Sequence, residues 1–138
     1  MIVALLLAAD LCASVTDIVH TAPDAFQRIR GSKREESAKT ISWKDPVRIP
    51  GADRCRVIEF KDGAQPFYGC EMAARKCPEQ EKKFEEMARE LSGCIGEAKR
   101  SGDEKKRTAF FHPHAIPVRL QLQRGATCEL RFFIEPLK

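Results

Sequence analysis

Hydrophobic and polar residues alternate most regularly near the end of the chain. Apolar side chains occupy every second position in 118–122 and in 128–134, and most of the residues between them are polar or charged. This period of two predicts two strands of a sheet that has one buried and one solvent-facing side. Residues 124–126, Arg-Gly-Ala, supply the turn between the strands.

A second group of strands is predicted between residues 41 and 72. Alternating apolar residues mark 41–49, and the segments 55–61 and 66–72 flank Asp62-Gly63, a strong signal for a two-residue hairpin turn. Pro66 has no amide hydrogen, so we expect its strand to lie at an edge of the sheet or to be bulged near the turn.

Two helices are also expected. The first covers 21–31, where Thr21 can cap the helix and Pro23 suits its first turn. The second begins at Pro78 and carries apolar residues at helical spacing on one side. That stripe consists of Phe84, Met87, Ala88, Leu91 and Ile95. The residues that follow, 97–107, are predicted to form a charged loop.

The order of the predicted elements is α-β-β-β-α-β-β. A two-layer α+β domain, with helices packed on one face of a four- to five-stranded antiparallel sheet, satisfies this order. The chain has 138 residues, of which 43% are hydrophobic and 32% charged, which fits one modest core and a soluble surface. We therefore predict a single domain over 14–138.

The beginning of the chain resembles a leader sequence. The first nine residues, MIVALLLAA, are apolar, but Asp10 makes the run too short to span a bilayer. Small residues at 13 and 14 suit cleavage by a signal peptidase, whereas no lysine or arginine precedes Arg28. We predict a signal peptide over 1–13, truncated at its basic end, and hence a periplasmic or secreted protein without a transmembrane anchor. The alternative is a buried helix or strand that the mature protein retains.

Six cysteines in a chain of this length favour disulfides, and the absence of a Cys-x-x-Cys pair excludes a zinc ribbon or a thioredoxin motif. A two-residue turn at Asp62-Gly63 places Cys55 opposite Cys70, at a distance that a disulfide can bridge. A bulge at Pro66 would shift that register. Cys77 and Cys94 would lie about 25 Å apart on one helix, so they cannot be joined.

The partner of Cys94 is left open by the sequence. Cys128 is one candidate, and Cys55 and Cys70 are the others. Cleavage after residue 13 would remove Cys12 and leave five cysteines, an odd number, of which at least one would be free or intermolecular.

Two small groups of residues suggest chemistry. Cys77 precedes a helix and follows Arg75 and Lys76, which favours a thiolate and a thiol-based redox protein, although a bridged or idle cysteine is the simpler interpretation. His112 and His114 would share one face of an extended segment and could bind a metal, although exposed loop histidines explain the pattern equally simply.

Motifs for catalysis, phosphate loops and dinucleotide binding are absent, so we assign no catalytic residue and no cofactor, and we disfavour an enzyme. The net charge of +4, from 24 basic and 20 acidic residues, is too mixed for a dedicated nucleic-acid-binding protein. The sequence therefore predicts a non-catalytic binding module that contacts a protein partner, or a second copy of itself, through its sheet.

Overall fold

The computed structural model describes residues 2–44 and 46–135. Two helices and eight strands make up the fold, with short 3₁₀ turns at Ala22–Asp24 and Pro113–Ala115. The helices are α1 (Ile2–Thr21) and α2 (Cys77–Ile95). The strands are β1 (Lys33–Glu36), β2 (Thr40–Lys44), β3 (Arg54–Phe60), β4 (Phe67–Arg75), β5 (Lys99–Gly102), β6 (Lys106–Phe111), β7 (Val118–Arg124) and β8 (Cys128–Ile134).

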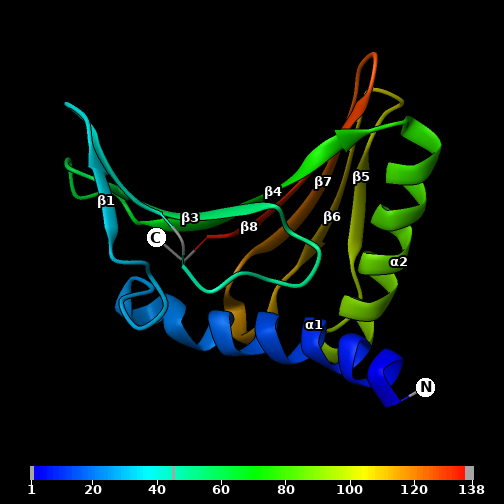
Figure 1. Ribbon diagram of the computed structural model, residues 1–138, viewed down its shortest axis with the longest axis horizontal. Helices are drawn as coiled ribbons and strands as arrows, with labels where there is room; N and C mark the ends of the chain where they lie inside the picture. Colours follow the sequence, from blue (N-terminus) through cyan, green and yellow to red (C-terminus); the bar gives the residue numbers. More distant parts are fainter. Residues whose placement is uncertain (1, 45, 136–138) are drawn as a thin grey trace.

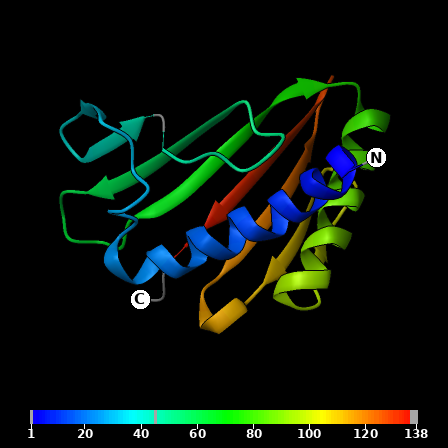
Figure 2. The same cartoon turned by 60° about the horizontal axis from the view of Figure 1, so that its bottom comes forward.

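All eight strands form one antiparallel sheet in the order β1-β2-β3-β4-β8-β7-β6-β5. Each helix is followed by four strands that pair in sequence, and the two runs meet where β4 pairs with β8. The sheet is strongly curved, and α1 crosses its concave side while α2 runs beside the half formed by β5 to β8 (Figure 1). A view from below shows α1 passing across several strands (Figure 2).

The predicted α+β class is correct, but the predicted sheet of four to five strands and the order α-β-β-β-α-β-β are wrong. The sheet has eight strands because 33–36, 99–102 and 106–111 also pair as strands, so the charged loop predicted over 97–107 is wrong. The first two segments carry charged or small polar side chains, and in the third only Ala109 and Phe111 alternate as buried apolar residues, which is too short a pattern to mark a strand. The helix expected over 21–31 is also wrong: that segment is a 3₁₀ turn and loop after α1.

Pro66 lies just before β4 rather than within it, so its missing amide hydrogen interrupts no pairing in that strand. The strand is central, because it pairs with β3 on one side and β8 on the other. The prediction of an edge position for this segment is therefore wrong.

The core lies between the concave face of the sheet and the helices. A row of directly opposed buried residues crosses five strands; it consists of Cys55, Cys70, Phe132, Leu120 and Ala109. The predicted stripe of α2 packs onto this face, with Phe84 and Leu91 almost fully buried. On α1, the spacing of Leu11, Val15 and Ile18 matches one helical face, and all three are buried.

Tyr68 joins the loop after β2 to this core. Its side chain is fully buried, and its hydroxyl donates a hydrogen bond of 2.6 Å to the carbonyl oxygen of Val47. Burial raises the pKa of the Tyr68 phenol well above its ordinary value. The neighbouring Ile49 is buried as well, so the loop closes the concave side near β3 and β4.

Three disulfides crosslink the fold. Cys12–Cys94 joins the two helices, Cys55–Cys70 joins directly opposed positions of β3 and β4, and Cys77–Cys128 joins the first residue of α2 to the first residue of β8. The helix α1 is continuous across the predicted cleavage position between residues 13 and 14. Cleavage there would remove both the buried Leu11 and one partner of the interhelical bridge.

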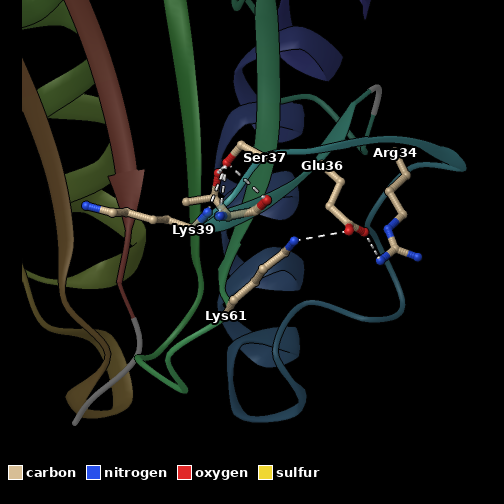
Figure 3. Close-up of polar contacts among 6 residues, drawn as sticks. Arg34, Glu36, Ser37, Lys39 and Lys61 are labelled. Carbon is tan, nitrogen blue, oxygen red and sulfur yellow. Dashed lines mark hydrogen bonds and ion pairs between the residues drawn. The ribbon is translucent and has the colours of Figure 1, made fainter.

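The two edge strands are short and charged. Strand β1 reads KREE and β5 reads KRSG, with four residues each. At the β1 edge, Figure 3 shows the Glu36 carboxylate accepting hydrogen bonds from Lys61, at 3.0 Å, and from Arg34. The hydrogen bond from Lys61 and the charge of Arg34 lower the pKa of Glu36. Short charged edges oppose the addition of a further strand, so the edges are poor sites for a partner chain.

Candidate functional site

The cysteines singled out from the sequence are all bonded. Cys77 is joined to Cys128, so it has no thiol in this structure, and Cys94 is joined to Cys12 rather than to Cys128. The structure contains no free cysteine among its described residues. The arrangement that would make Cys77 a nucleophile is therefore missing from the oxidised form.

The histidines lie in a different setting from the extended pair expected. His112 is exposed and precedes the 3₁₀ turn that contains His114, whose left-handed backbone has φ of 51°. The His114 ring faces His20 at the end of α1, with 5.6 Å between the ring centroids. Within residues 2–44 and 46–135, no group of three or more metal-binding side chains could hold a metal ion. Two imidazoles alone do not make a built metal site.

A more promising surface is the convex face of the sheet, which we call the outer face. Side chains alternate along a strand, so residues next to the buried positions of β3, β4, β7 and β8 point away from both helices. Neither of the two described helices lies over this side of the sheet (Figure 1). An antiparallel sheet tolerates one solvated face, but this face also carries large apolar side chains.

Three phenylalanines form a row across the outer face. Phe60 and Phe67 have ring centroids 6.0 Å apart, and Phe67 and Phe133 have centroids 6.2 Å apart. Each of the three side chains is half-buried. Gly69 lies beside this aromatic row; a Cβ atom there would be 3.3 Å from the rings of both Phe67 and Phe133. The absence of a side chain at 69 lets both rings lie over the backbone.

Arginines surround one end of the aromatic row. In the register of the sheet, Arg54, Glu71 and Arg131 are directly opposed on neighbouring strands. Glu71 accepts a 2.7 Å hydrogen bond from Arg54. This hydrogen bond lowers the pKa of Glu71, and the charges of Arg131 and Arg56 lower it further. The field at this position is therefore positive.

Arg56 differs from its neighbours. Arg54 pairs with Glu71, and Arg131 pairs with Glu129 at 3.1 Å. Arg56 makes no hydrogen bond or ion pair with any residue that the structure describes, and its Nε atom is buried without a partner. It stands directly opposite Gly69, so its side chain emerges beside the phenylalanine rings.

These side chains enclose a shallow cavity of about 200 Å³, which we call the outer-face pocket. Gly69 forms part of its floor, while Phe67 and Phe133 form its apolar walls. The complete lining is Arg54, Arg56, Ile58, Phe67, Gly69, Cys70, Glu71, Arg131 and Phe133. A second hollow of about 620 Å³ lies on the other side of Phe67 and extends from Phe60 to Glu135. The two hollows share the Phe67 ring.

Comparison with known proteins gave no assignment: no family model, no curated protein and no solved structure matches the chain. Among the residues that the structure describes, neither helix combines the length and apolar character needed to cross a membrane.

The sequence contained one unused signal for this site. Alternation assigns residue 133 to the solvent-facing side of its strand, between Arg131 and Glu135, yet the residue is phenylalanine. Its neighbours Phe67 and Gly69 come from a strand more than 60 positions earlier, so only the pairing of β4 with β8 brings them together.

Proposed function

We propose that this protein is a non-catalytic binding module and that the outer face of its sheet is the binding surface. The observation that carries the proposal is the outer-face pocket, in which an arginine without an internal partner stands beside two phenylalanine rings and a glycine floor. Concave sites lined by apolar groups and a few polar ones are typical ligand sites. Both edge strands, β1 and β5, are short and charged and oppose the addition of a further strand, so a partner would bind the outer face rather than an edge of the sheet.

The proposal includes export to an oxidising compartment, either the periplasm or the extracellular medium. Three disulfides in a chain of 138 residues support it, because such bonds persist where thiols are not continuously reduced. Intact mass of the protein from its native source, before and after reduction and alkylation, tests this part. Loss of residues 1–13 would leave two of these three bridges, whereas a retained α1 would keep all three.

The binding surface can be tested with two matched charge reversals. Arg56→Glu changes the outer face, and Arg89→Glu changes the exposed side of α2, where Arg89 makes no ion pair with a described residue. Each protein would be used to capture partners from the native extracytoplasmic fraction, with quantitative mass spectrometry. We expect a partner that binds the wild type and Arg89→Glu alike and is lost with Arg56→Glu. Equal capture by Arg56→Glu would overturn the proposal.

A further inference from the structure

We infer that the outer-face pocket recognises an acidic peptide segment of a partner protein, in which a carboxylate lies next to an aromatic or aliphatic side chain. This inference rests on the proposed function and adds the chemistry of the ligand. It is drawn from the charges around the pocket, its apolar walls and its continuity with the second hollow.

The charge balance favours an anionic ligand. Arg54, Arg56 and Arg131 line the pocket, and Glu71 is the only acidic residue among its lining residues. Glu71 is already hydrogen-bonded to Arg54, and Arg131 is paired with a glutamate outside the pocket. The positive charge of Arg56 is therefore the one that a bound carboxylate can neutralise, and a guanidinium holds a carboxylate by two parallel hydrogen bonds.

The walls favour an apolar group beside that carboxylate. The pocket has apolar walls formed by Phe67, Phe133 and Ile58 and a volume of about 200 Å³, which suits one large side chain of a partner. Because the rings of Phe67 and Phe133 already cover the Gly69 backbone, a bound ring or aliphatic group would pack against these rings. Burial of such a group against two phenylalanine rings would supply the apolar part of the affinity.

The second hollow favours an extended chain over a free small molecule. It shares Phe67 with the outer-face pocket and is lined by the residues of the β3–β4 turn and by Glu135. An extended peptide advances about 3.3 Å per residue, so a few residues can cross Phe67 and reach both hollows.

Two other occupants fit less well. The acidic residues Glu71, Glu129 and Glu135 are spread over the same face, so they would repel the continuous phosphates of a nucleic acid. A second copy would bring its own Arg54, Arg56 and Arg131 to a face that already has unneutralised positive charge. A peptide with separate carboxylates avoids both conflicts.

The test compares peptides that differ only in charge. Fluorescently labelled Gly-Ser-Phe-Glu-Glu-Ser-Gly and Gly-Ser-Phe-Gln-Gln-Ser-Gly, with blocked ends, would be titrated with the full chain and followed by anisotropy. We expect the glutamate peptide to bind at least tenfold more tightly, with an affinity that falls as salt is raised. Titration with a single-stranded oligonucleotide tests the nucleic acid as an alternative ligand, and sedimentation of the protein alone tests self-association.

Variants locate the binding. Arg56→Gln should weaken binding of the glutamate peptide at least tenfold, whereas Arg89→Gln should leave it unchanged. Gly69→Ala should weaken it as well, because the new methyl group narrows the floor between Phe67 and Phe133. Circular dichroism and urea unfolding of each variant show whether the fold is retained.

Equal binding of the two peptides, or wild-type affinity in folded Arg56→Gln, would overturn the inference. Tighter binding of the oligonucleotide, or self-association that requires Arg56, would overturn it too. If neither peptide binds but Arg56→Glu still abolishes partner capture, only the acidic chemistry of the ligand fails. If Arg56→Glu retains capture, the proposed function itself fails.

Discussion

The bridge between the two helices, Cys12–Cys94, gives the sharpest prediction about stability. We expect the double variant Cys12→Ser/Cys94→Ser to fold but to lose several kcal/mol of unfolding free energy. Cys94 is exposed and Cys12 half-exposed, so serine is tolerated at both positions and little packing is lost. The change therefore reports mainly the constraint that the bridge places on the unfolded chain.

The size of the effect follows from the length of chain that the bridge closes. The two cysteines are 82 positions apart, for which the chain-entropy relation gives about 4.5 kcal/mol at 25 °C. The same relation gives about 3 kcal/mol for Cys55–Cys70, which are 15 positions apart. Domains are stable by roughly 5–15 kcal/mol, so the variant should remain folded but lose a large share of its unfolding free energy.

Urea unfolding of recombinant full-length protein under oxidising conditions measures this loss, with the single tryptophan, Trp43, as the fluorescent probe. For a slope of about 2 kcal/mol per molar urea, the midpoint should fall by about 2 M. Ala13→Ser, an exposed substitution next to the bridge, should leave the midpoint unchanged. A loss below about 1 kcal/mol would refute the reasoning, since the bridge would then not constrain the unfolded chain as the relation requires.

Four further changes probe the core, the turns and the outer face. Tyr68→Phe should lower the unfolding free energy by about 1 kcal/mol, because the hydrogen bond from the buried Tyr68 hydroxyl to the carbonyl oxygen of Val47 is lost. In the wild type, the raised pKa of Tyr68, the single tyrosine, means that stability is complete below about pH 10 and falls above it, with tyrosinate absorbance appearing on unfolding. Gly102→Ala should disrupt the β5–β6 turn by roughly 2 kcal/mol or more, because φ is +113° and the new Cβ would meet a backbone carbonyl, with faster hydrogen exchange in β5 as the measurement. Glu71→Gln should lose less unfolding free energy than the wild type on acidification below about pH 4, because Arg54 lowers the pKa of Glu71 in the folded state. If the ion pair between Arg54 and Glu71 contributes nothing to stability, the substitution should have no effect at neutral pH. Arg56→Met should keep the unfolding free energy measured in urea or raise it by up to about 1 kcal/mol, while abolishing binding of the acidic peptide.

The parts of the fold that could be predicted are those with local signals. Strands β7 and β8 alternate over enough residues to be recognised, and the helical spacing in α2 identifies its buried side. The two-residue turn expected at Asp62-Gly63 predicts the register in which β3 and β4 pair, although the structure joins these strands by the longer segment 61–66. In each case the pattern lies within one short segment of sequence.

The elements that were missed lack such a signal. Strands β1 and β5 are charged edge strands, and a sequence of this kind resembles a solvated loop because water, not a core, contacts its side chains. The apolar start of α1 has the length and composition of a leader, so composition alone does not separate an exported signal from a helix that covers the sheet. The central pairing of β4 with β8 joins distant segments and has no local mark.

The outer face shows why sequence alternation alone understates this surface. Phe67 and Phe133 have a structural role, since cross-strand aromatic contact over a glycine supports a strand that Gly69 would otherwise weaken. Arg56 has no such role: a buried Nε without a partner opposes folding, and a methionine of similar length would not carry that penalty. A residue that burdens the fold and faces a solvent-open pocket is better explained by an external partner than by stability. The response of Arg56→Met, stable but unable to bind, would separate these two explanations.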